Sequence, residues 1–134
     1  MTLKVALIGF GYWGPKLARN IQNSSHFEID SIIDTSKKNL AKAQKSFPLA
    51  NRLSNFKKLN LKKINLVVIS SPTKTHYQMA NYFLKHVNVL IEKPLALNLK
   101  HVSKLIFLRL KKKLLKLPSL IIDITRTQRQ SQLF

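Results

Sequence analysis

The three glycines of this 134-residue chain all lie within six residues, at Gly9, Gly11 and Gly14. A nearly continuous apolar run, residues 3–8, precedes them, and apolar residues at helical spacing follow them. G-x-G-x-x-G between a strand and a helix is the pattern that holds the pyrophosphate of a dinucleotide. The other interpretation is a turn that only links strand to helix. Because glycine occurs nowhere else, we favour a backbone that must approach a ligand.

Each glycine has its own expected role. Gly9 allows a sharp turn after the strand, and Gly11 leaves the main chain bare for a phosphate. Gly14 lets the following helix pack close to the strand. The residues between the glycines are expected to contact the cofactor as well, and they are Phe10, Tyr12 and Trp13.

A helix is expected over residues 15–22, directly after the glycines. Pro15 suits its first turn, where a missing N–H costs nothing. The remaining free N–H groups and the positive end of the helix dipole attract phosphate. The helix therefore completes the expected pyrophosphate site.

Asp34 follows a second expected strand, residues 27–33, and lies 20 residues after Gly14. An acid at this place in a dinucleotide fold hydrogen-bonds the adenine ribose. Its charge repels a 2′-phosphate, which favours NAD over NADP, although Lys37 and Lys38 can weaken that preference. Thr35 is included in the expected cofactor site, and the alternative role of Thr35-Ser36 is to cap the next helix.

The rest of the chain alternates between strand and helix patterns, which predicts an α/β fold with one doubly wound parallel sheet. We expect helices at 38–46, from 73 or 75 to 84, and at 98–115, strands at 51–53, 65–70 and 87–91, and a short helix or turn at 56–61. The pattern at 120–124 is compatible with a sixth strand. The strand at 65–70 is expected to be central. The expected domain is 1–117, followed by a divergent basic tail, 118–134.

Two polar loops follow expected strands, and ligands of an open parallel sheet lie outside the carboxyl ends of its strands. The first loop runs from Ser71 to His76, in which Thr73 or Thr75 is expected to cap a helix. Taken alone, His76 is interpreted as a surface or helix-start residue and not as a catalyst.

The second loop is Glu92-Lys93-Pro94. Pro94 keeps Lys93 out of the helical region, so the lysine is expected to be extended beside the ligand. Its ammonium can donate a hydrogen bond to a substrate oxygen. The alternative is an ordinary turn lysine, and spacing alone does not decide between the two.

Composition narrows the function classes. There is no cysteine, which excludes disulfides and thiolate metal sites, and no metal is expected. No apolar run reaches the roughly 18 residues of a membrane span, and no signal-peptide pattern is seen, so a cytoplasmic protein is expected. The net charge of +19 is spread over scattered lysines without a nucleic-acid motif. We read these lysines as solvated surface and do not expect nucleic-acid binding.

Taken together, the glycine loop, Asp34, Ser71-Pro72-Thr73 with His76, and Glu92-Lys93-Pro94 resemble the N-terminal domain of the Gfo/Idh/MocA oxidoreductases. The resemblance covers about residues 3–106. It implies a Rossmann-type fold that binds NAD, or less readily NADP. The run Gly-Tyr-Trp-Gly-Pro-Lys is similar to the subset that acts on nucleotide-linked sugars.

The resemblance also implies roles for individual residues. It makes Lys93 the catalytic candidate, in contact with both cofactor and substrate. It places the Pro72-Thr73 loop against the nicotinamide. The remaining cofactor-binding candidates from these loops are Ser71, His76, Glu92 and Pro94.

Members of that family continue into a second α/β domain that supplies most sugar contacts. This chain ends at Phe134, and its polar, basic residues 125–132 do not resemble the family's continuation. We expect a truncated or frame-disrupted single domain without its substrate domain, which binds NAD but is inactive alone. A divergent but genuine final helix and strand is the alternative for the tail. The alternative functions are half of a split oxidoreductase completed by a partner chain, and a non-enzymatic module that binds nucleotides or nucleic acid.

Overall fold

Side chains of the first strand alternate between two apolar layers, and this alternation organises the fold. The structure is a computed structural model and describes residues 1–114. In β1 (Leu3–Ile8), Val5 and Leu7 lie in one buried cluster, whereas Ala6 and Ile8 lie in the other. A strand with apolar residues on both faces must be covered on both faces, as in parallel sheets.

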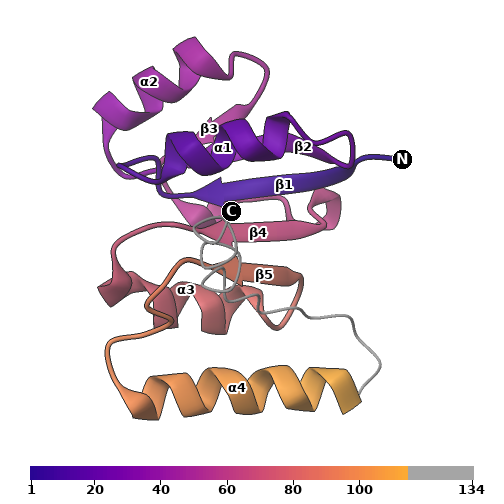
Figure 1. Ribbon diagram of the computed structural model, residues 1–134, viewed down its shortest axis with the longest axis vertical. Helices are drawn as coiled ribbons and strands as arrows, with labels where there is room; N and C mark the ends of the chain where they lie inside the picture. Colours follow the sequence, from indigo (N-terminus) through magenta and orange to yellow (C-terminus); the bar gives the residue numbers. More distant parts are fainter. Residues whose placement is uncertain (115–134) are drawn as a thin grey trace, which may run out of the picture.

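Five parallel strands form one sheet in the order β3-β2-β1-β4-β5 (Figure 1). The other strands are β2 (Phe27–Ile33), β3 (Asn51–Leu53), β4 (Leu66–Ile69) and β5 (Asn88–Ile91). β1 is in the middle, and β4 is an interior strand beside it, in agreement with the expectation for residues 65–70.

Helices cover the two faces in pairs. α1 (Gly14–Gln22) and α2 (Lys37–Ser46) contribute Ala18 and Ala43 to the cluster that contains Val5. The other pair, α3 (Thr73–Phe83) and α4 (Leu99–Leu114), covers the opposite face of the sheet, to which it contributes Ala80, Phe83 and Leu105. The fold is therefore the predicted doubly wound α/β domain.

Reversal of the winding direction at β1 follows from this arrangement. The chain moves outward from β1 to β2 and β3, then returns to β4 and β5 on the other side. The loops after β1 and β4 therefore diverge to opposite faces, and a crevice opens between them at the carboxyl ends of the strands. In Figure 1 these loops lie on the left, where the β1 arrow ends.

Some local expectations need correction. The expected short helix or turn at 56–61 is in fact two 3₁₀ turns, Phe56–Lys58 and Leu61–Lys63. Asn55 precedes the first turn and Asn60 precedes the second. The side chain of each asparagine accepts a hydrogen bond from the backbone N–H two residues later and so caps the start of the turn that follows it.

Helix caps agree only in part with the sequence. Ser36 caps α2, and its hydroxyl accepts from the Asn39 N–H at 3.3 Å, as expected for Thr35-Ser36. Neither Thr73 nor Thr75 caps α3, because Pro72 occupies the capping position. The Thr75 hydroxyl instead donates to the Pro72 carbonyl at 2.7 Å.

The expected strand at 120–124 and the domain boundary at 117/118 lie outside the described residues. Within residues 1–114, no helix combines the length and the apolar character that a membrane crossing requires.

Candidate functional site

One cleft of about 500 Å³ lies where β1, β2, β4 and β5 end. The predicted site residues that line it are Gly9, Gly11, Tyr12, Trp13, Asp34, Thr35, Ser71, Pro72, Thr73, His76, Glu92 and Lys93. Phe10, Gly14 and Pro94 belong to the same loops but do not line the cleft. Ser36, Asn39 and Ser70 line it without having been predicted. The sequence signals converge at one place in the fold.

Gly9 and Gly14 are required by the protein's own backbone. Gly9 has φ of +93°, and a Cβ there would lie 2.6 Å from the Ser71 nitrogen. A Cβ on Gly14 would collide with the carbonyl oxygen of Gly9. These two glycines let the turn form and let α1 start against β1.

Gly11 is different, because nothing in residues 1–114 requires a glycine there. It is exposed, and no atom of the described residues lies within 4 Å of the position that its Cβ would take. It also lines the cleft, next to the N-terminal turn of α1. A bare main chain beside a helix N-terminus is suited to a bound phosphate group.

Asp34 supports the glycine loop as well as the cleft. Its Oδ2 accepts from the Phe10 N–H at 2.7 Å and from Asn39 Nδ2 at 3.1 Å, and its Oδ1 accepts from the Ser36 N–H at 2.8 Å. An ionised carboxylate has about four acceptor positions, so about one remains, on Oδ1. That position can accept a ribose hydroxyl.

Phe10 contributes to the fold through its side chain. The ring is 2% exposed and packs edge-on against Phe47, with 6.0 Å between the ring centroids. Its backbone N–H is the group that Asp34 holds. The side chain of Phe10 therefore anchors the glycine loop from below the cleft.

Ser70 joins the glycine loop to the end of β4. Its hydroxyl donates to the Gly9 carbonyl at 2.8 Å, and its backbone N–H donates to the Ile8 carbonyl at 2.8 Å. No motif indicates a role for this serine. The sequence signal that could have identified it is its position at the end of an interior strand, in the loop expected to face the glycine turn.

His76 is buried, so its interpretation as a surface residue is wrong, although it does lie at the start of α3. Only 1% of it is exposed. Its Nδ1 lies 2.9 Å from the Pro94 carbonyl oxygen and its Nε2 lies 2.6 Å from the Ser71 carbonyl oxygen. The ring thus connects the loop after β4 with the loop after β5.

Lys93 is exposed at the cleft, one residue after Glu92, whose backbone N–H donates to the Ile69 carbonyl at 2.8 Å. The Lys93-Pro94 peptide bond is cis. Within residues 1–114 the one ion pair joins Lys4 and Asp30, so the ammonium of Lys93 has no carboxylate partner there. It is available to a ligand in the cleft.

Tyr12 and Trp13 form an exposed edge of the cleft and share Lys16. The Lys16 Nζ lies 3.8 Å from the centroid of the Tyr12 ring and 4.4 Å from that of Trp13. A hydrogen bond from Lys16, with its charge, lowers the pKa of the Tyr12 phenol. The two rings meet edge-on, with 5.4 Å between their centroids.

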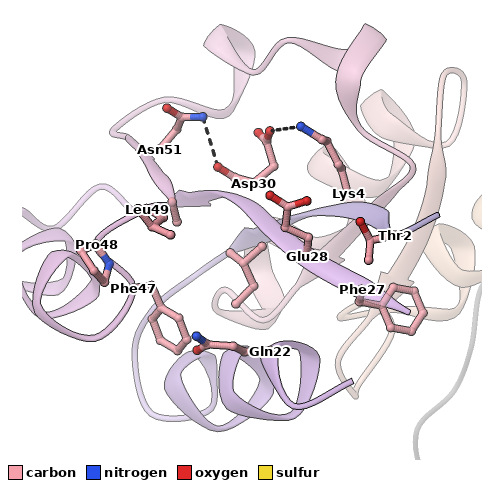
Figure 2. Close-up of a pocket in the computed structure, with 12 residues that line it drawn as sticks. Thr2, Lys4, Gln22, Phe27, Glu28, Asp30, Phe47, Pro48, Leu49 and Asn51 are labelled. Carbon is pink, nitrogen blue, oxygen red and sulfur yellow. Dashed lines mark hydrogen bonds and ion pairs between the residues drawn. The ribbon is translucent and has the colours of Figure 1, made fainter. Parts of the chain in front are cut away.

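A second and larger cavity, of about 650 Å³, lies near the starts of β1 and β2 (Figure 2). It is bounded by residues 47–51, and Asp30 spans it by pairing with Lys4 at 3.7 Å and accepting through its carbonyl from Asn51 at 3.2 Å. No predicted site residue lines it. It lies away from the carboxyl ends of the strands, so we place the functional site in the smaller cleft.

The described part of the chain offers no cluster of side chains suited to binding a metal ion. Residues 1–114 contain no group of three or more histidine, cysteine or acidic side chains arranged to hold a metal ion.

A doubly wound parallel sheet, with a glycine loop and an acid at the switch point of its winding, defines a dinucleotide-binding Rossmann domain. The profile of an oxidoreductase family with an NAD-binding Rossmann fold matches residues 3–116. The chain belongs to this family, the Gfo/Idh/MocA oxidoreductases.

Solved structures share the fold. A Bacteroides fragilis protein described by sequence as an oxidoreductase is 31% identical with a TM-score of 0.80, over 94% of this chain and 36% of that one. An Agrobacterium radiobacter oxidoreductase in complex with NAD⁺, L-tartaric acid and magnesium is 20% identical with a TM-score of 0.81, over 90% and 35%. Biliverdin reductase of Synechocystis, with biliverdin and NADP⁺, is 26% identical with a TM-score of 0.78, over 83% and 35%.

The chain thus spans about a third of the length of the solved proteins that it matches. Among curated proteins, no sequence matches it.

Proposed function

We propose that this domain binds NAD(H) in the cleft at the carboxyl ends of its strands. It would serve as the cofactor domain of an oxidoreductase that acts on a CH–OH group of a sugar or nucleotide sugar. The observation that carries the proposal is the exposed, side-chain-free main chain at Gly11, which the fold itself does not require. The family supplies the class of cofactor.

The cleft divides into three parts that fit the three parts of a dinucleotide. Gly11 and the N-terminus of α1 offer backbone N–H groups and a positive dipole end to the pyrophosphate. Asp34 offers its remaining acceptor position to the adenine ribose. The loop at Pro72-Thr73, together with Lys93, is left for the nicotinamide end.

Asp34 supports NAD over NADP. Its carboxylate is held by three donors at the place where a 2′-phosphate would approach, and two like charges so close repel each other. Lys37 and Lys38 are exposed at the start of α2 and offset part of this repulsion. We therefore expect a preference for NAD and not an exclusion of NADP.

A bound nicotinamide ring supplies the hydride acceptor or donor. Lys93 would donate a hydrogen bond to the oxygen of the reacting group and so orient it. The described residues supply the cofactor half of the site, and hydride transfer also requires a substrate held in near-attack geometry. We accordingly expect NAD binding without turnover from this chain alone.

Calorimetric titration tests the proposal directly. A folded sample is titrated with NAD⁺ and, separately, with NADP⁺, and we expect saturable binding that is tighter for NAD⁺. Absence of NAD⁺ binding at millimolar concentration by a sample that is folded by circular dichroism would overturn the proposal.

A second candidate is an oxidoreductase whose substrate half comes from a partner chain, because the described residues supply the cofactor half of the site. Absorbance at 340 nm with NAD⁺ and UDP-N-acetylglucosamine-type sugars separates the two. NAD⁺ reduction that appears only when a second protein is added supports the split enzyme. No NAD⁺ reduction with any of the neighbouring gene products opposes the split enzyme.

A further inference from the structure

Among residues 1–114, the buried imidazole of His76 faces two hydrogen-bond acceptors and no donor. Its ring nitrogens lie 2.9 Å from the Pro94 oxygen and 2.6 Å from the Ser71 oxygen, and both oxygens are backbone carbonyls. A carbonyl oxygen can only accept. Each contact is therefore a hydrogen bond only when the ring nitrogen in question carries a proton.

The two carbonyls belong to different loops of the cleft. Ser71 follows β4 and contacts the cleft directly, whereas Pro94 follows Lys93 in the turn after β5. The last backbone bond of the β4–β5 pairing runs from the Glu92 N–H to the Ile69 carbonyl. Beyond it, the turn leaves the sheet.

Within residues 1–114, the contact with His76 is the one hydrogen bond that joins residues 93–97 to the rest of the domain. Leu95 adds an apolar contact with the core, but a side chain packed among others fixes direction less strictly than a hydrogen bond does. The orientation of the turn that carries Lys93 therefore depends on the hydrogen bond between His76 Nδ1 and the Pro94 carbonyl.

We propose that His76 is a positioning residue, which sets Lys93 in the cleft by holding the Pro94 carbonyl against the start of α3. The proposal rests on the proposed function, because it concerns the contact that Lys93 makes with the dinucleotide. His76 itself acts through the turn and not by chemistry on the ligand.

A purely structural histidine would behave differently. Its removal would weaken the domain as a whole, and any loss of NAD⁺ affinity would be independent of the side chain at position 93. A positioning residue loses its effect once the side chain that it positions is gone, which is the non-additivity that a double-mutant cycle measures.

Asparagine and glutamine provide a matched pair of variants. The amide nitrogen of asparagine takes the place of Nδ1, and that of glutamine takes the place of Nε2. His76→Asn therefore keeps a donor toward Pro94, and His76→Gln keeps a donor toward Ser71. Both replacements are neutral amides, so the comparison isolates which carbonyl is held.

The experiment measures NAD⁺ affinity by calorimetry for these two variants, each with Lys93 and with Lys93→Met. We expect His76→Gln to weaken binding about tenfold, equivalent to about 1.4 kcal/mol. His76→Asn should recover most of the affinity. In the Lys93→Met background, His76→Gln should cause no further loss.

Equal losses for His76→Asn and His76→Gln, or a His76→Gln loss that is the same in both backgrounds, would overturn the proposal. A measurement on the unaltered protein covers the case in which the variants do not fold. We expect an NMR coupling through the hydrogen bond between His76 Nδ1 and the Pro94 carbonyl carbon. An Nδ1 without a proton would contradict the proposal that His76 holds the Pro94 carbonyl. If the unaltered protein binds no NAD⁺ but shows this coupling, the proposed function fails while the contact stands.

Discussion

The carboxylate of Asp34 accepts a hydrogen bond from the backbone N–H of Phe10 at 2.7 Å. An acid at the end of β2 thereby holds the glycine loop that follows β1. The same carboxylate is the expected partner of the adenine ribose. One side chain thus holds the glycine loop and, on the proposed function, also contacts the ribose, so its replacement should affect both stability and ligand preference.

Asp34→Asn is expected to lower the free energy of unfolding by about 1–3 kcal/mol, because an amide cannot accept from all three donors at once. It should also weaken NAD⁺ binding and narrow the preference for NAD⁺ over NADP⁺, since the repelling charge is gone. Urea denaturation and two calorimetric titrations measure these effects.

Asn39→Ala is the matched control for that variant. It removes one donor, at 3.1 Å from Asp34 Oδ2, but leaves the charge in place. The preference for NAD⁺ should persist. An unchanged ratio of NAD⁺ to NADP⁺ affinity in Asp34→Asn would show that the carboxylate does not read the 2′ position.

Gly9→Ala should destabilise the fold whether or not a ligand is present. The residue has φ of +93°, and an added Cβ would lie 2.6 Å from the Ser71 nitrogen. The strained conformation alone costs about 1–3 kcal/mol. Thermal and urea unfolding check this loss, and a variant as stable as the parent would mean that the turn differs from the one described.

Lys16→Met should raise the pKa of Tyr12 toward its usual 10.0, because Lys16 is the group that lowers it. A lowered phenol pKa stabilises the folded state only above the unfolded value of about 10 and ceases to do so as the pH falls through the folded value. At neutral pH the phenol is uncharged, so this interaction should leave stability unchanged there.

Phenolate absorbance during an alkaline titration measures the pKa, and Tyr12→Phe identifies which transition belongs to Tyr12 among the three tyrosines of the chain. A Tyr12 pKa that does not respond to Lys16→Met would contradict the contact between the two residues.

The elements of the sheet and its helices could be predicted from sequence because short apolar runs and helical spacing are local signals. The position of the cleft could be predicted for the same reason, because the glycine cluster and Asp34 are local signals that follow predicted strands. Local reasoning failed where a side chain is used at a distance. Nothing near His76 in the sequence indicates that the carbonyl of Pro94, 18 residues later, will cover it.

Ser70 and Thr75 show the same limit. Ser70 reaches the Gly9 carbonyl across 61 positions of sequence, a pairing that only the strand order creates. Thr75 has a good capping side chain, but Pro72 takes the capping position and the threonine hydroxyl bonds to its carbonyl. The capping preference of threonine indicated where α3 begins but not which residue takes the capping position.

On the proposed function, the main chain at Gly11 is bare because a pyrophosphate lies against it. Gly11→Ala and Gly11→Val add side chains where the structure has open space, so both should unfold within about 0.5 kcal/mol of the parent. Calorimetric titration of NAD⁺ into the three proteins is the most direct measurement. We expect NAD⁺ binding by the parent, weaker binding by Gly11→Ala, and a loss of affinity of at least about tenfold, or about 1.4 kcal/mol, for Gly11→Val. Undiminished NAD⁺ affinity in a folded Gly11→Val protein would contradict a pyrophosphate site at Gly11.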